Sequence, residues 1–161
     1  MKRVLITGKG SYIGSHFRDY LKEFPNDYYV EELDVRDDSW KQFDFSKFDV
    51  VYHVAGIAHI KETKENASLY YKVNRDLAVE IAKLSKSYGV KHFIFMSSMS
   101  VYGLIYSNDL ITVNTKTNPS TNYGKSKLQA ENEILKLADD TFKVSVLRPP
   151  MVYGKNSPGN M

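Results

Sequence analysis

Residues 4–14 hold the sequence feature that most constrains the fold: an apolar run passes directly into a glycine-rich turn, VLITGKGSYIG. After the turn, apolar residues recur at the spacing of one helix face, at Ile13, Phe17, Leu21 and Phe24. The order is therefore strand, tight turn and helix. A turn of this kind aims backbone N–H groups and a helix N-terminus at one point, which suits a phosphate.

The glycine spacing predicts a dinucleotide site, because the turn lies between a strand and an amphipathic helix. Gly8 would make the tight turn, and Gly10 or Ser11 would let the backbone approach a pyrophosphate. Gly14, one turn into the helix, would let the helix pack closely against the strand.

An acidic residue about 20 positions after such a turn is expected to hold the adenosine ribose. Asp34 lies 20 residues after Gly14, and Glu31 and Glu32 compete with it for this role. Arg36 could stack on adenine, or it could pair with a 2′-phosphate and favour NADP. We therefore expect NAD as the cofactor, with NADP not excluded.

Predicted strands and helices alternate along the chain. Apolar runs predict strands at residues 3–7, 28–35, 49–55, 92–96 and 142–147. Helical periodicity predicts helices at residues 11–24, 66–88 and 123–138, with one or two helical turns between 37 and 48 and a long loop over 101–119. This alternation favours a parallel sheet with helices on both faces.

Length and composition indicate one globular domain and disfavour several partners. A net charge of +3, with scattered Lys and Arg, does not indicate nucleic acid. No apolar run approaches the roughly 20 residues of a membrane span. The absence of cysteine excludes disulfides, thiol catalysis and Cys-ligated zinc, and it fits a cytoplasmic protein. No spacing of His, Asp and Glu suggests a metal site.

Tyr123 and Lys127 lie four residues apart at the start of the predicted helix 123–138, so they share a face. A nearby ammonium stabilises a phenolate, and we expect Lys127 to lower the pKa of Tyr123 from about 10 toward neutrality. The helix N-terminus and a cationic nicotinamide would act in the same direction. Serines follow the strand 92–96, where ligands of an open parallel sheet bind, and can hold a substrate oxygen while Tyr123 moves a proton.

Together these motifs resemble those of extended short-chain dehydrogenases/reductases of the NAD-dependent epimerase/dehydratase (nucleotide-sugar epimerase-like) family. The resemblance covers nearly all 161 residues and implies one NAD(P)-binding domain over residues 1–161, with a Rossmann-type doubly wound parallel sheet. The matching segments are residues 7–14, 34–37, 53–56, Asn74, Ser98 before Val101-Tyr102-Gly103, Tyr123 with Lys127, and residues 148–154.

The resemblance implies a role for each motif residue. Tyr123 would be the acid/base, Lys127 would hold the nicotinamide ribose and tune Tyr123, and Ser98 would bind the reacting oxygen while hydride passes to or from the nicotinamide. The implied cofactor-binding residues are Gly8, Gly10, Ser11, Tyr12, Ile13, Gly14, Asp34, Val35, Arg36, Val54, Ala55, Gly56, Asn74 and Lys127. The loop residue His59 could border the nicotinamide.

Three departures from the family pattern carry further expectations. Ser11 replaces the middle glycine, so the pyrophosphate contact is expected to rely on Gly10. Related sequences often have an extra strand and helix before the segment at Asp34, so a shortened unit is expected here. Met99 and Ser100 stand where sugar 4,6-dehydratases carry an Asp-Glu pair, which favours epimerase or ketoreductase chemistry.

The family resemblance implies an epimerase or oxidoreductase acting on a nucleotide sugar. A 4-keto-sugar reductase and a non-catalytic dinucleotide sensor are the alternatives. Family proteins are about twice as long, with a C-terminal substrate domain. We expect that domain to be absent from this chain, which would then bind cofactor but turn over poorly. A homodimer through residues 66–88 and 123–138 is also expected.

Overall fold

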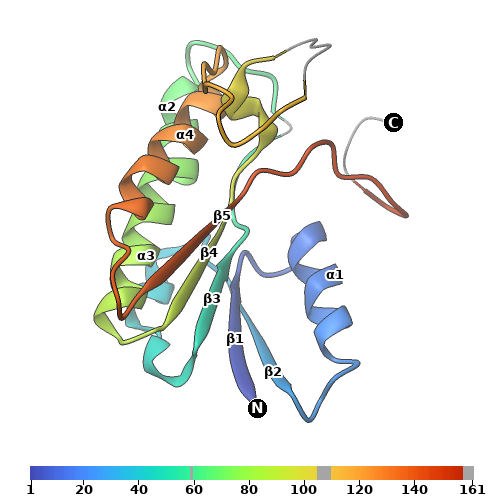
Figure 1. Ribbon diagram of the computed structural model, residues 1–161, viewed down its shortest axis with the longest axis vertical. Helices are drawn as coiled ribbons and strands as arrows, with labels where there is room; N and C mark the ends of the chain where they lie inside the picture. The colour runs from blue at the N-terminus through green and yellow to red at the C-terminus, as the bar shows by residue number, and fades with distance from the viewer. Residues whose placement is uncertain (59, 105–109, 158–161) are drawn as a thin grey trace.

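A computed structural model describes residues 1–58, 60–104 and 110–157. Within this part, five parallel strands form one sheet in the order β2-β1-β3-β4-β5 (Figure 1). The strands are β1 (Lys2–Thr7), β2 (Tyr28–Leu33), β3 (Val50–His53), β4 (His92–Met96) and β5 (Lys143–Leu147). The predicted parallel sheet is confirmed. The bounds of β4 are as predicted and β1 begins one residue earlier, whereas β2, β3 and β5 are shorter than the apolar pattern indicated.

Helices cover both faces of the sheet, as predicted. Helix α1 (Tyr12–Leu21) lies on one face, and α2 (Ala67–Tyr70), α3 (Leu77–Ser87) and α4 (Asn122–Leu135) lie on the other (Figure 1). Alternate residues of β1 serve the two cores: Val4 and Ile6 pack with Leu21 of α1, whereas Leu5 joins the core under α3 and α4. This alternation is the period-2 geometry of a strand that is buried on both sides.

The expected shortened unit is confirmed at β2. This strand follows α1 directly and pairs with β1 along its whole length, from Lys2 opposite Tyr28 to Thr7 opposite Leu33. Two short 3-10 turns (Asp38–Gln42 and Phe45–Lys47) then lead to β3. The strand order reverses direction between β1 and β3, and ligands of doubly wound sheets bind at the carboxyl ends of strands at such a point.

The predicted helix 66–88 is interrupted by a wider turn. Helix α2 is followed by a π-helical segment, Tyr71–Asp76, before α3 begins at Leu77. Asn74 lies within this segment and is fully buried. π-helical turns are frequent at functional sites, and the predicted role of Asn74 in cofactor binding stays a prediction.

A buried ion pair joins the elements that carry the predicted catalytic residues. Glu131 of α4 is 1% exposed, and its carboxylate accepts two hydrogen bonds from Arg148 Nε at 3.0 and 3.1 Å. The Ser97 hydroxyl also donates to Glu131, and Arg148 Nη1 donates to the Tyr102 hydroxyl at 2.9 Å. The ends of β4 and β5, the 3-10 turn Met99–Tyr102 and α4 are therefore fixed to one another.

Replacing Arg148 with Met tests this ion pair. The substitution would leave the Glu131 carboxylate buried without its cationic partner, and we expect the free energy of unfolding to fall by about 3 kcal/mol. The control is Arg36→Met, which breaks the pair with Asp34. The arginine side chain of that pair is 84% exposed, so its loss is expected to lower the stability much less. Urea unfolding of both variants measures the difference, and equal losses would contradict this account of Glu131.

Candidate active site

The glycine turn between β1 and α1 has a backbone that only glycine adopts readily. Gly8 and Gly10 have φ values of +111° and +76°. A Cβ on Gly8 would lie 2.8 Å from the backbone nitrogen of Ala55, so the turn approaches the segment after β3 too closely for any side chain. The Gly8 and Lys9 N–H groups donate to the Leu33 carbonyl at 3.0 and 3.2 Å, which ties the turn to the end of β2.

Ser11 and Gly14 together form the start of α1. Ser11 is the N-cap, with an ordinary φ of −68°, and its hydroxyl accepts a hydrogen bond from the Gly14 N–H at 3.2 Å. A Cβ on Gly14 would lie 2.6 Å from Ser11 Oγ and 3.1 Å from the Val54 side chain. The serine therefore causes no backbone strain, and the helix packs closely on the strands at Gly14, as the glycine spacing indicated.

The acidic side chain that reaches the glycine turn is Glu32, not Asp34. The Gly10 N–H donates to Glu32 Oε1 at 3.2 Å, and Arg18 of α1 pairs with the same carboxylate. Asp34 instead accepts hydrogen bonds from Arg36, which lower the pKa of the Asp34 carboxyl to about 2. Sequence spacing alone could not separate these two acids.

The two residues that follow Asp34, which were also predicted to bind the cofactor, differ in burial. Val35 is buried in the core, and the Arg36 side chain is exposed.

The segment that follows β3 is clamped from both sides. The Val54 and Ala55 N–H groups donate to the Thr7 carbonyl at 3.1 and 3.0 Å. Asn74 Oδ1 accepts the Ile57 N–H at 2.9 Å, and Asn74 Nδ2 donates to the Ile57 carbonyl at 3.0 Å. The buried amide therefore holds the path of the chain through Gly56.

Gly56 lies between Asn74 and Lys127. A Cβ there would lie 2.9 Å from Asn74 Oδ1 and 3.2 Å from Lys127 Nζ. The segment after β3, the π-helical turn and α4 therefore meet at one point, and the absent side chain leaves room for the lysine.

The Lys127 ammonium is buried at the carboxyl end of β4. Its side chain is almost wholly covered, and Nζ donates to the Met96 carbonyl at 2.8 Å and lies 4.8 Å from the Phe95 ring centroid. Burial lowers the pKa of Lys127 to about 8, although the nearby Glu131 carboxylate acts to raise it.

Tyr123 and Ser98 come together at the same edge. Burial raises the pKa of the Tyr123 phenol above its usual value, and the neighbouring Ser98 side chain acts against this rise. Ser98 Oγ also accepts the Ser100 N–H at 3.1 Å, which fixes the serine at the start of its turn. The expectation that Lys127 lowers the Tyr123 pKa toward neutrality is wrong for this structure, because burial of the phenol dominates and the ammonium donates to Met96.

Sequence analysis missed Glu62, which lies in the loop between β3 and α2. Its carboxylate accepts the backbone N–H groups of Asn122 and Tyr123 at 2.9 and 3.0 Å. Nothing local in the sequence indicates this contact, since the partners are 60 and 61 residues apart. The nearby expectation for His59 lies outside the described residues.

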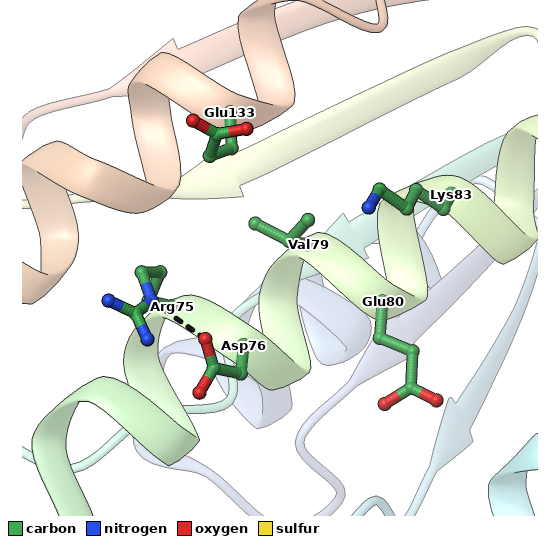
Figure 2. A pocket seen from close by; sticks show the side chains of 6 residues that line it. All are labelled: Arg75, Asp76, Val79, Glu80, Lys83 and Glu133. Carbon is green, nitrogen blue, oxygen red and sulfur yellow. Dashed lines mark hydrogen bonds and ion pairs between the residues drawn. The ribbon is translucent and has the colours of Figure 1, made fainter. Parts of the chain in front are cut away.

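A hollow lies between helices, away from the carboxyl ends of the strands. It has a volume of about 260 Å³ and is lined by charged side chains and Val79 of the α2–α3 stretch together with Glu133 of α4 (Figure 2). Arg75 donates to Asp76 within it at 2.7 Å. None of its residues comes from a strand end or the glycine turn.

The homodimer expected through these helices stays a prediction.

Among the described residues, no group of His, Cys, Asp and Glu side chains could hold a metal ion. In the same ranges, no helix is both long and apolar enough to cross a membrane. The expected cytoplasmic location stays a prediction.

Two alanine substitutions in the glycine turn separate steric contact from backbone strain. Gly8→Ala would place a methyl group against the Ala55 backbone in a strained conformation, with an expected loss of more than about 3 kcal/mol in the free energy of unfolding. Gly10→Ala meets no atom within 4 Å and should cost only the left-handed backbone penalty of about 1–2 kcal/mol. Thermal and urea unfolding compare the two, and an equal or larger loss in Gly10→Ala would contradict the close approach at Gly8.

Comparison with known proteins finds relatives among nucleotide-sugar epimerases. UDP-glucose 4-epimerase of Vibrio cholerae is 30% identical over 182 residues, covering 99% of this chain and 54% of the relative. The chain thus spans about half the length of the curated relatives that it matches.

Solved structures share the fold. UDP-glucuronic acid 4-epimerase from Bacillus cereus, in complex with NAD, superposes with a TM-score of 0.80 at 23% identity, covering 96% of this chain and 58% of that one. The UDP-Glc/GlcNAc 4-epimerase from Campylobacter jejuni gives 0.75 at 26% identity, covering 92% and 53%. The sequence model of one family matches residues 4–161, and the chain belongs to that family, the NAD dependent epimerase/dehydratase family.

Proposed function

We propose that this chain binds NAD along the carboxyl ends of β1, β3 and β4 and forms the catalytic half of a nucleotide-sugar 4-epimerase. One observation carries the proposal: three separate parts of the chain meet at the same edge of the sheet. They are the glycine turn, the buried Asn74–Gly56–Lys127 contact, and the Ser98–Tyr123 pair. The 4-epimerase relatives named above support the substrate class.

The residues present fit a dinucleotide. Gly8 and Gly10 carry no side chains in the turn before the N-terminus of α1, where backbone N–H groups and the helix dipole favour a pyrophosphate. Glu32 accepts the Gly10 N–H, so it is placed to exchange that bond for one to a ribose hydroxyl. Gly56 leaves room for Lys127, whose ammonium would donate to a second ribose when the cofactor binds.

NAD, when bound, would supply reversible hydride transfer between its nicotinamide and a sugar carbon. Tyr123 would take the proton of the sugar hydroxyl on its phenolate oxygen and return it to the keto oxygen. Ser98 would hold that oxygen, and it lies close enough to Tyr123 to influence the pKa of the phenol. Because its pKa is raised, the Tyr123 phenol is protonated at neutral pH, which suits donation of a proton to the keto oxygen. Uptake of the proton of the sugar hydroxyl needs the phenolate, and therefore added positive charge nearby.

Met99 and Ser100 favour this chemistry over dehydration. The position after Ser98 carries no carboxylate, and Ser100 is engaged with Ser98 through a hydrogen bond at 3.1 Å between their hydroxyls. Reduction of a 4-keto sugar uses the same groups, so the reductase remains the alternative to epimerisation.

Cofactor binding is tested by thermal unfolding of the chain with NAD and with NADP. At 100 times its dissociation constant, a ligand adds about 2.7 kcal/mol of stability, which is a rise of several degrees in Tm for a chain of this size. Lys127→Met should reduce the NAD-dependent rise, whereas Lys125→Met, on the exposed side of the same helix, should keep it. No rise with either dinucleotide would contradict the proposal.

The role of Tyr123 is tested by reduction of bound NAD, followed at 340 nm after addition of UDP-glucose, UDP-galactose or UDP-glucuronic acid. Tyr123→Phe should slow reduction by about 100-fold or more, because it removes the acid/base while keeping the ring. Tyr20→Phe, an exposed tyrosine of α1, is the matched control and should react like the unchanged protein. Reduction by Tyr123→Phe at the rate of the unchanged protein would contradict the acid/base role.

A further inference from the structure

Glu62 makes a contact that none of the roles above explains. It lies in the loop between β3 and α2, and its carboxylate reaches the first turn of α4. Oε2 accepts the Asn122 backbone N–H at 2.9 Å and the Asn122 side-chain amide at 3.1 Å, and Oε1 accepts the Tyr123 backbone N–H at 3.0 Å. The acceptor is therefore bound to the backbone of the predicted acid/base residue itself.

This contact goes beyond ordinary helix capping. The N-cap of α4 is Thr121, whose hydroxyl accepts the Gly124 N–H at 3.0 Å. One such bond is the usual complement of a cap, and the remaining free N–H groups of a first turn normally face water. Here Glu62 satisfies two of them with an ionised group, so the first turn of α4 is held from outside the helix.

The loop that carries Glu62 is itself anchored. The Tyr70 hydroxyl donates to the Ile60 carbonyl at 2.6 Å, and the Asn66 side chain donates to the Lys61 carbonyl and accepts the Thr63 N–H, both at 2.9 Å. The Tyr70 ring also meets the Tyr123 ring edge to face, with centroids 6.5 Å apart. Tyr123 is thus fixed through its backbone by Glu62 and through its ring by Tyr70.

We propose that Glu62 is a positioning residue for Tyr123, which holds the first turn of α4 in place and offsets the positive end of that helix. The proposal rests on the proposed acid/base role of Tyr123. Because the Glu62 carboxylate offsets the positive end of the helix, the N-terminus of α4 stabilises the Tyr123 phenolate less than a helix end without such a carboxylate would. Ionisation of Tyr123 then depends on the positive charge that arrives with a bound cofactor.

The charges around Glu62 agree with this role. Burial alone would raise the pKa of the Glu62 carboxyl, but the N–H groups of Tyr123 and Asn122, helped by Lys125, outweigh burial and lower it. Glu62 is therefore ionised at neutral pH. Because its pKa in the folded chain is below the unfolded value, its stabilising contribution is present above that value and is lost as pH falls through the folded pKa.

The first test uses the unchanged protein. In an acid titration followed by 15N NMR, the amide signals of Asn122 and Tyr123 should move together, with a common midpoint below the usual glutamate pKa of about 4.3. Protonation of the shared acceptor would cause this movement. Amide signals that stay still over that range, or that move with unrelated midpoints, would overturn the proposal.

The second test uses Glu62→Gln with tyrosines labelled at the ring carbon that bears the hydroxyl. The Tyr123 signal is assigned by its loss in Tyr123→Phe. With the charge removed, the Tyr123 pKa should fall toward the usual tyrosine range, and hydrogen exchange of the Tyr123 amide should become faster. Glu65→Gln, an exposed glutamate of the same loop, should change neither. An unchanged Tyr123 titration in folded Glu62→Gln would overturn the proposal.

Neither measurement needs a substrate, so the two proposals fail separately. Should Glu62→Gln not fold, as judged by circular dichroism, the titration of the unchanged protein decides the matter. Full hydride transfer in Tyr123→Phe would overturn the acid/base role while leaving the Glu62 contacts intact.

Discussion

The close approach of two backbones at the carboxyl ends of β1 and β3 is the constraint on which the rest of the structure depends. Gly8 meets the Ala55 backbone, and the Thr7 carbonyl accepts the N–H groups of Val54 and Ala55. Side chains are excluded here, so the N-terminus of α1 faces an open edge of the sheet. The shortened unit at β2 strengthens this arrangement, because β2 pairs directly with β1 and its end holds the glycine turn.

Buried charges organise the opposite half of the edge. Lys127 is placed beside Gly56 and Asn74, and Glu131, one turn further along α4, binds both Ser97 and Arg148. An unpaired charge at such depth would be costly, so each group constrains its neighbours. The serine turn after β4 and the tyrosine of α4 are therefore held on one frame, and Glu62 adds a third fixed point from the loop after β3.

Local patterns predicted most of the fold, whereas contacts between distant segments were beyond them. Strands such as β3 and β4 could be predicted from apolar runs, and the turn at the start of α1 from Ser11 to Gly14, because each of these patterns lies within a few consecutive residues. The pairing of β2 with β1, the π-helical turn around Asn74, and the positions of Glu32 and Glu62 depend on segments far apart in sequence. The pKa of Tyr123 was misjudged because spacing shows a nearby lysine but not the burial of the phenol.

The central claim is that a dinucleotide binds along this edge, and 15N NMR of the chain during addition of NAD tests it most directly. The amide signals of Gly8, Gly10, Gly56 and Tyr123 should shift together and saturate, while those of Val79 and Glu133 in the hollow between helices stay in place. Shifts confined to the hollow, or no saturable shift at the glycine turn, would contradict the claim.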